Sequence, residues 1–316
     1  MKIHLVLMLI LVMGGCLSRA DGAERQKIIF DCDLAGDVDD AFALALILAS
    51  PEFEVLGIVM DHGYTEKRAQ VACRVLYETG REDIPVVVGR KTGDGISHQF
   101  SWGAGFEKLK PIRTPGADFI IEKLRAFPNQ IVLITVGPVP NMADIIDKDP
   151  EALKLAKHIY AMFGSFYMGY DEGPIPSPEW NVRADVPASK KYVASGAPIT
   201  YAGLDITTFV RLTEEYRNRI FLRRSPLTDA LSSLYTLWRY EGYAEADCKL
   251  YDAVAVGMVL WPELFTTRKA HVKVTDEGYT VIDESKAPNC EIGMTINEDE
   301  FLARLTARYL HQNLMR

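Results

Sequence analysis

The stretch IIFDCDLAGDVDDAFALAL, residues 28 to 46, places five aspartates within ten positions, between two apolar runs. These are Asp31, Asp33, Asp37, Asp39 and Asp40. Like charges this close repel one another, and burial raises the cost further. The stretch therefore predicts a compensating feature, which is a bound cation, a helix N-terminus or plain exposure to solvent.

The residues on either side of the aspartates predict a buried strand at 27–33 and a helix at 38–50. Asp39 and Asp40 fall in the first turn of that helix, where the helix dipole favours negative charge. Asp31 and Asp33 close the strand.

Apolar runs continue to alternate with helical patterns along the chain, which predicts an α/β fold with a largely parallel central sheet and helices on both faces. In such a sheet, ligands bind outside the carboxyl ends of the strands, so the aspartates fall at the ligand-binding edge. A hairpin at 270–283 and a final amphipathic helix at 296–314, capped by Asn297, are also expected. Further strands are predicted at 53–61, 84–89, 130–138 and 157–164.

The composition is that of an ordinary globular protein, with 316 residues, 48% hydrophobic and 25% charged. The formal net charge is −8, and no basic stripe appears, so nucleic acid is not an expected partner. We expect a single domain over residues 27–316.

The N-terminus reads as a signal peptide over residues 1–20, because its apolar stretch from Ile3 to Met13 is too short to span a bilayer. The sequence MGGC at 13–16 resembles a lipoprotein cleavage box with lipidation at Cys16, and cleavage after Ala20 is the rival. The expected location is therefore exported, either periplasmic or anchored to a membrane by lipid.

The four remaining cysteines form no CxxC pair, which argues against a metal–thiolate site. Buried free thiols are the favoured interpretation, and one disulfide is the alternative in an exported protein. The four are Cys32, Cys73, Cys248 and Cys290.

Three interpretations compete for the aspartate cluster. Asp39 and Asp40 could cap a helix while the others are solvated. The DxD of IIFDCDLAGD fits a phosphotransferase of the haloacid dehalogenase type, but Ala35 stands where that pattern needs Thr or Val. The third interpretation is a hard-cation site for a sugar substrate, because Ca²⁺ takes six to eight oxygen ligands from carboxylates, carbonyls and water.

The third interpretation gains support because the chain resembles the inosine–uridine nucleoside hydrolases, whose motifs occur here in the same order. The segments that carry the resemblance are FDCDLAGDVDDAFALAL (30–46), VLGIVMDHG (55–63), DIPVVVG (83–89), ITVGPVPNMADII (134–146), MFGSFYMGY (162–170), PEWNVRADVPAS (178–189), YAGLDITT (201–208) and LYDAVAVGMVLWPELF (250–265).

The resemblance implies a role for each matching residue. Asp33 matches the general base that activates the attacking water and also touches the metal. The other implied metal ligands are Asp40, the Val136 carbonyl and Asp252, with Ca²⁺ as the cofactor. The implied contacts to the ribose hydroxyls are Asp39, Asp252, Glu179 and Asn181.

Three departures from the family pattern concern the same edge. The loop between Asp33 and Asp39 is two residues longer than in the family pattern and contains Asp37. Asp37 is either a solvated residue, which we favour slightly, or a further contact to metal or sugar. Tyr251 stands where many members have a His that protonates the leaving base, and Tyr is the poorer acid. Tyr64 and Tyr170 replace sugar-contacting asparagines and indicate an altered substrate pocket.

We therefore expect a Ca²⁺-dependent enzyme that splits a nucleoside or related ribosyl compound into ribose and base, with a homo-oligomer left open. One alternative is a hydrolase of another glycosidic substrate. Another is a nucleoside- or sugar-binding lipoprotein without catalysis, since all three tyrosine replacements lie in implied site positions.

Overall fold

An eight-stranded sheet forms the centre of the protein, in the order β3-β2-β1-β4-β5-β6-β10-β7. The computed structural model describes residues 24–242 and 247–315. Neighbouring strands pair in parallel except for the edge strand β7, which runs antiparallel to β10. This confirms the predicted α/β class with a largely parallel sheet. The strands are β1 (Gln26–Cys32), β2 (Phe53–Met60), β3 (Val86–Val88), β4 (Ile131–Thr135), β5 (His158–Met162), β6 (Ile199–Ala202), β7 (Phe265–Ala270) and β10 (Cys290–Ile296).

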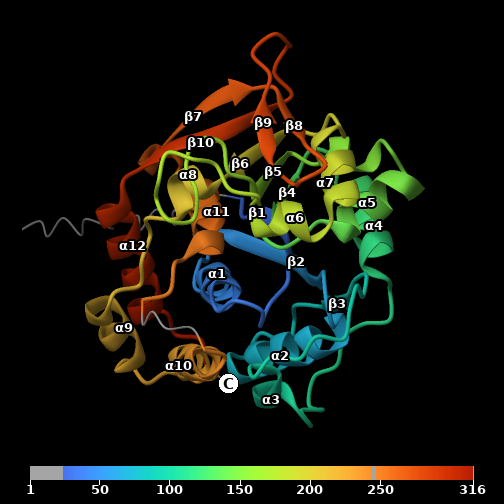
Figure 1. Cartoon of the computed structure of the whole chain (residues 1–316). Helices are drawn as coiled ribbons and strands as arrows, with labels where there is room; N and C mark the ends of the chain where they lie inside the picture. The colour runs from blue at the N-terminus through green and yellow to red at the C-terminus, as the bar shows by residue number, and fades with distance from the viewer. Residues whose placement is uncertain (1–23, 243–246, 316) are drawn as a thin grey trace, which may run out of the picture.

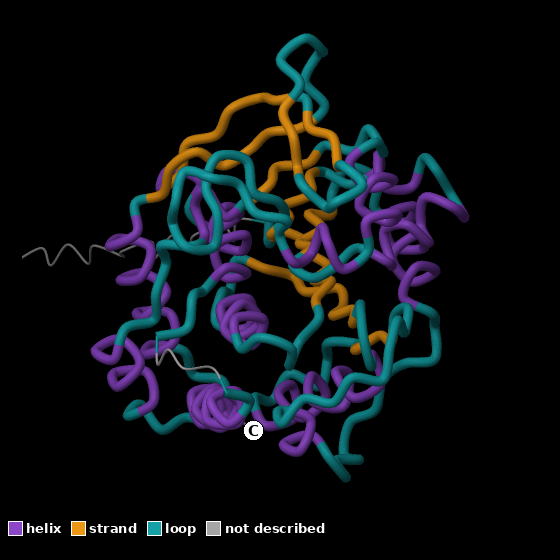
Figure 2. The backbone as a smooth tube through the Cα atoms, viewed as in Figure 1, coloured by secondary structure: helices purple, strands orange, loops and turns teal. Residues whose placement is uncertain are grey.

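Helices cover both faces of the sheet (Figures 1 and 2). In β1, Ile28, Phe30 and Cys32 join one core while Ile29 joins the other, because successive side chains of a strand point to opposite faces. On the Phe30 side lie α1 (Asp39–Leu48), α2 (Thr65–Glu78), α9 (Glu214–Phe221), α10 (Pro226–Tyr240), α11 (Tyr251–Leu260) and α12 (Glu298–His311). On the Ile29 side lie α4 (Gly116–Ala126), α5 (Pro140–Lys148) and α7 (Val186–Val193).

Short elements complete the described chain. The hairpin expected at 270–283 is present as β8 (Val272–Val274) paired antiparallel with β9 (Thr280–Ile282). The Asn297 side chain accepts a hydrogen bond from the Glu300 backbone N–H at the start of α12, which confirms the predicted cap. The remaining short helices are α3 (Phe100–Gly103), α6 (Trp180–Ala184), α8 (Leu204–Thr207) and the 3₁₀ turns η1 (Ala152–Leu155) and η2 (Pro262–Leu264).

Several sequence predictions concern the N-terminus and the cysteines. The expected signal segment, with Cys16, lies outside the described residues. Within residues 24–242 and 247–315, no helix has both the length and the apolar character needed to cross a membrane. Cys32, Cys73, Cys248 and Cys290 are all buried free thiols, as favoured from the sequence.

The strand order explains where a ligand site can form. From β1 the chain moves outward through β2 to β3 and then returns to β4 on the other side of β1. Such a reversal opens a crevice at the carboxyl ends of β1 and β4. The loops that follow β1, β2 and β4 and the long segment 163–179 after β5 all lie at this edge.

Helix α1 begins at the crevice, and all ten of its residues are buried. It packs against α11 and is flanked by α10 and α12. One anchor is the hydroxyl of Tyr309 on α12, which donates to the Phe42 carbonyl of α1 at 2.6 Å. The placement of the first-turn aspartates therefore depends on outer helices from the far end of the chain.

The Tyr309→Phe substitution should lower the free energy of unfolding by about 1 kcal/mol, because it removes one buried hydrogen bond and keeps the ring. Denaturant unfolding measures the change. Tyr240→Phe is the matched control, since Tyr240 is 74% exposed. Equal stability of the two variants would contradict this anchoring role.

Candidate active site

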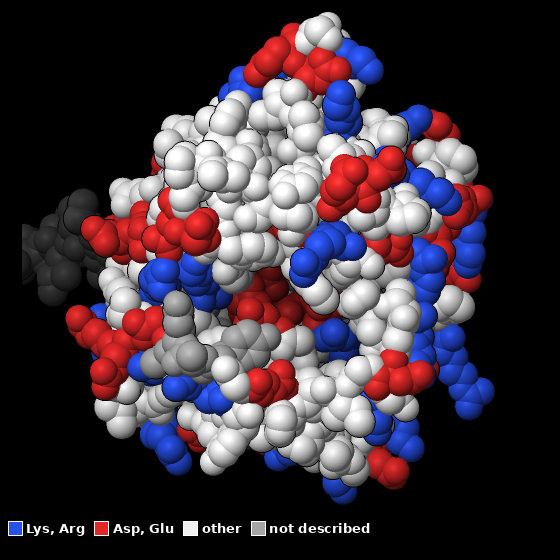
Figure 3. All heavy atoms as spheres, viewed as in Figure 1, with Lys and Arg blue, Asp and Glu red and all other residues white. Residues whose placement is uncertain are grey.

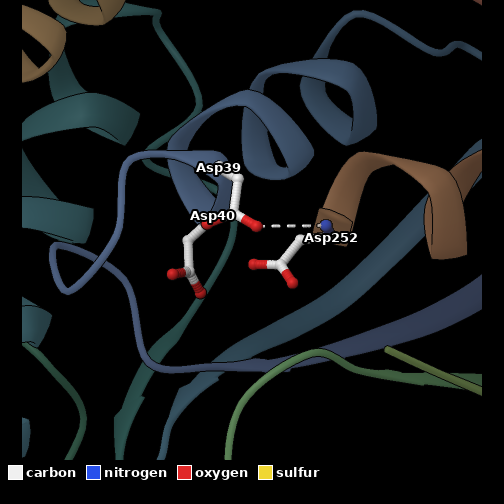
Figure 4. Close-up of side chains that lie close together, drawn as sticks. All are labelled: Asp39, Asp40 and Asp252. Carbon is white, nitrogen blue, oxygen red and sulfur yellow. Dashed lines mark hydrogen bonds between the residues drawn. The ribbon is translucent and has the colours of Figure 1, made fainter. Parts of the chain in front are cut away.

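Three buried aspartates from opposite ends of the chain converge at the sheet edge (Figure 4). Asp39 and Asp40 begin α1, and Asp252 lies in the first turn of α11. One carboxylate oxygen from each lies within 4.8 Å of the other two. The backbone N–H of Asp252 also donates to Asp39 Oδ2 at 3.3 Å, so the starts of the two helices are joined directly.

The environment of these carboxylates suits a cation. Burial raises the pKa of Asp39, Asp40 and Asp252 well above the ordinary value, and the neighbouring carboxylates raise it further. Asp40 Oδ1 is buried and has no hydrogen-bond partner among the described residues. Buried carboxylates need pairing or a metal to remain charged, and an all-oxygen donor set is the kind that Ca²⁺ or Mg²⁺ prefers. The residues present therefore fit a hard cation.

Asp33 lies just beyond β1 and pairs with Arg68 of α2; it lines the same cavity as the three clustered aspartates but is not a member of that cluster. Arg68 Nη2 lies 3.5 Å from Asp33 Oδ2. The same guanidinium donates to the backbone carbonyls of Asp33, Leu34 (2.8 Å) and His62 (2.8 Å). One buried cation thus joins the loop after β1 to the loop after β2.

A second pair of buried acids lies beneath Asp33. Asp31 and Asp61 are both fully buried, and burial raises the pKa of each, that of Asp31 to about 7. Asn141 Nδ2 donates to Asp31 Oδ2 at 2.8 Å. A Cβ atom on Gly137 would lie 2.5 Å from Asp61 Oδ1 and 2.9 Å from Asp33 Oδ1, so only glycine allows the loop after β4 to approach this closely.

A cavity of about 650 Å³ opens above the acids, and Figure 3 shows its mouth with acidic side chains on its floor. Every residue singled out from the family motifs lines this one cavity. His62 and Trp180 also line it, whereas His98, Trp102, Phe166 and Tyr167 do not. The motif-derived lining residues are Asp33, Asp39, Asp40, Tyr64, Val136, Tyr170, Glu179, Asn181, Tyr251 and Asp252.

Glu179 and Asn181 hold the wall of the cavity together. Glu179 precedes α6 and caps it, accepting from the backbone N–H groups of Asn181 and Val182. Asn181 Nδ2 donates to the carbonyls of Val136 and Met162, each at 2.9 Å. Burial raises the pKa of Glu179 to about 7, although the donors around it oppose this shift.

Two tyrosines that depart from the family pattern stand side by side. The rings of Tyr170 and Tyr251 meet edge to face, with centroids 6.2 Å apart. Burial, followed by the charge of Asp39, raises the pKa of Tyr251 above its ordinary value. Tyr251 is therefore an even poorer acid than an exposed tyrosine, though a phenol hydroxyl is able to donate a hydrogen bond without ionising.

Asp37 is half-buried in the cavity wall. The interpretation favoured from the sequence, a solvated side chain, therefore does not hold. Its Oδ1 accepts from the Val38 backbone N–H at 2.6 Å. Gln99 Nε2 donates to the carbonyls of Gly36 (3.0 Å) and Asp37 (3.3 Å), which fixes the inserted loop. Burial raises the pKa of Asp37 to about 6.

Sequence reasoning missed Arg68 and Asp61. A signal was present for Arg68, because it lies three and four positions before the buried Val71 and Ala72 and so falls on the inward face of α2. Asp61 follows an apolar strand as Asp33 does, and that repetition could have marked a second acid at the edge.

Comparisons with known proteins identify the family to which the chain belongs. The family model for the inosine–uridine preferring nucleoside hydrolases matches residues 28–303. The chain is 28% identical to the pyrimidine-specific ribonucleoside hydrolase RihA of Citrobacter koseri, covering 89% of this chain and 97% of that protein. It is 29% identical to RihB of Escherichia coli, covering 88% and 95%.

A solved structure shares the architecture. The plant nucleoside hydrolase PpNRh1 superposes with a TM-score of 0.80 at 26% identity, covering 91% of this chain and 99% of that one. The family model matches nearly the whole described chain, and the motif residues gather in one cavity. This chain therefore belongs to the inosine–uridine preferring nucleoside hydrolase family and is an N-glycosyl hydrolase.

Proposed function

We propose that this protein hydrolyses the N-glycosidic bond of a nucleoside, or a related ribosyl compound, in a Ca²⁺-dependent reaction that releases ribose and base. The observation that carries the proposal is the convergence of Asp39, Asp40 and Asp252 on the floor of a cavity that Asp33 also lines. A cavity of about 650 Å³ falls within the usual range for small-molecule sites.

The residues that would hold the ion are Asp33, Asp40, the Val136 carbonyl and Asp252. When bound, Ca²⁺ supplies a hard Lewis acid and a template for oxygen ligands. Asp39 and Asp252 would accept hydrogen bonds from the ribose hydroxyls and fix the sugar against the floor. Such positioning converts much of the binding energy into rate.

Asp33 is the proposed general base. Its carboxylate would accept the proton of the attacking water as the N-glycosidic bond breaks. The transition state of glycoside hydrolysis resembles an oxocarbenium ion, and the surrounding carboxylates place negative charge near that developing positive charge.

Arg68 is proposed to hold Asp33 in place. It is 7% exposed, and its guanidinium contacts the Asp33 carboxylate and the carbonyls on both sides of the crevice. A planar group with several donors in fixed directions suits this bridging role, which a lysine cannot reproduce.

The Asp33→Asn variant should lose about 10²–10⁴-fold in kcat at saturating Ca²⁺, because the amide cannot accept the proton, and should also bind Ca²⁺ more weakly, because Asp33 is a proposed ligand. Reducing-sugar release over a nucleoside panel measures kcat, and calorimetry measures affinity. Asp83→Asn is the control, since Asp83 lies outside the cavity. Turnover equal to that of the control would rule out the base assignment.

Removal of divalent ions with EGTA should abolish ribose release, and added Ca²⁺ should restore it. Independently of activity, millimolar Ca²⁺ should raise the Tm, because an ion bound only by the folded state stabilises that state. The Asp252→Asn variant should lose most of this shift. Full activity in EGTA together with an unchanged Tm would contradict the Ca²⁺ site.

Arg68→Met should lower kcat/KM about 10–100-fold and destabilise the fold by about 3 kcal/mol, because it leaves buried acceptors and a carboxylate unpaired. Arg68→Lys should recover only part of each loss. Arg74→Met is the matched control, because Arg74 lies on the same helix but contacts Glu78 and Trp102 outside the cavity. If the Arg68→Met and Arg74→Met variants behave alike, Arg68 does not position Asp33.

A further inference from the structure

The charge of the side chains that line the cavity is one-sided. Of its two arginines, Arg68 is buried and paired with Asp33, and Arg183 is exposed to solvent. Among the residues that the structure describes, the acids that line the cavity are Asp33, Asp37, Asp39, Asp40, Glu179, Glu241 and Asp252. Even if Glu179 is neutral, the six other acids exceed two guanidinium groups and one bound divalent ion by two negative charges. A substrate therefore enters a negative field whichever wall it faces.

Two of these acids take no part in the floor. Asp37 belongs to the inserted loop, and Glu241 follows α10. Glu241 Oε1 accepts from the Ser97 hydroxyl and from the His98 backbone N–H. Gln99, the next residue, donates to the Asp37 carbonyl at 3.3 Å. One short segment thus fixes both acids in the lining, where they add negative charge that neither the ion site nor the general base requires.

The aromatic rings of the cavity also suit positive charge. The rings that line it belong to Tyr64, Tyr170, Trp180 and Tyr251. Lys91 Nζ lies 4.1 Å from the centre of the Tyr64 ring. The Arg183 guanidinium lies 5.4 Å from the centre of the Trp180 ring. The faces of such rings attract cations, so the aromatic part of the lining favours the same sign of charge as the acids do.

The lining offers little to protonate a departing base. Tyr251 is a phenol and a weak acid at neutral pH. Burial lowers the pKa of His62, so its imidazole is largely neutral near pH 7. The His62 Nδ1 atom also lies 2.9 Å from the Thr92 hydroxyl. A base that already carries a positive charge needs no proton, because it leaves as a neutral molecule.

These features act on the charge of the ligand and do not depend on one pose. A cleft lined by one sign of charge concentrates ligands of the opposite charge. We propose that the preferred substrates are ribosides whose base carries a fixed positive charge, namely N-ribosylated pyridinium or N-alkylated purinium compounds. Asp37 and Glu241 are the specificity-determining residues. The inference rests on the proposed nucleoside hydrolysis and specifies its substrate class.

The reaction of such a substrate requires no acid for the base. The bond between C1′ and the ring nitrogen breaks, and its electron pair neutralises the positive nitrogen. The oxygen of water bonds to C1′, and Asp33 accepts the proton of that water. In the transition state the positive charge moves from the base to the sugar and stays within the same acidic lining.

Three ligands of nearly equal size separate charge from shape. Nicotinamide riboside is a cation, 1,4-dihydronicotinamide riboside is neutral, and nicotinic acid riboside carries a carboxylate that cancels its positive charge. Calorimetry on the Asp33→Asn variant at saturating Ca²⁺ should give a Kd for nicotinamide riboside about tenfold below the other two. A difference of less than about threefold, or tighter binding of either analogue, overturns the inference.

Turnover by the parent protein distinguishes this inference from the proposed function. The kcat/KM for nicotinamide riboside should exceed those for nicotinic acid riboside, uridine and inosine by about tenfold. If uridine or inosine is hydrolysed at least as well as nicotinamide riboside, the inference fails and the proposed function stands. If no riboside is hydrolysed, the proposed function fails, and the order of the Kd values still decides whether the cavity selects cations.

Asp37→Asn and Glu241→Gln supply the matched variants, since each removes one charge and keeps the shape of the side chain. Each should lower the ratio of kcat/KM for nicotinamide riboside to that for uridine about threefold to tenfold. The ratio is measured within one preparation, which makes it insensitive to the fraction folded. Asp83→Asn is the control, because it removes a charge outside the cavity. Ratios equal to that of the control in both variants overturn the role assigned to Asp37 and Glu241.

Discussion

Repulsion among buried carboxylates is the constraint around which this fold is arranged. Asp33, Asp39, Asp40 and Asp252 share one edge of the sheet and are each less than 9% exposed. The protein offsets part of that cost with the N-termini of α1 and α11 and with the guanidinium of Arg68. The part of the repulsion that these groups do not offset explains why a cation suits the floor of the cavity.

The topology makes this concentration of charge achievable. Because α1 is buried on every side, the aspartates of its first turn cannot point into solvent. The helix that brings Asp252 to the same place follows more than two hundred residues later and packs directly on α1. Gly137 then lets the loop after β4 close over the acids. The site therefore forms only when the whole sheet and its covering helices are in place.

The sequence predicted the parallel sheet and a helix over 38–50, because apolar periodicity is a local signal, whereas the residues of the cavity wall were implied by the family resemblance. It did not predict the role of Arg68, whose partners lie in two loops that meet only in the folded chain. It also did not show that Glu179 caps α6, since the backbone donors to its carboxylate come from Gly164 and the start of α6. Asp37 was misjudged because the packing of Gln99 against the inserted loop leaves no local trace.

The position of Cys32 between Asp31 and Asp33 has a chemical consequence. Burial, and then the negative charge of Asp40 and Asp61, raises the pKa of this thiol well above its ordinary value. The reactive form of cysteine is the thiolate, so electrophiles and oxidants find little thiolate to attack at this buried position. Burial and the same carboxylates that suit a cation thus keep the thiol at the end of β1 protonated and poorly reactive.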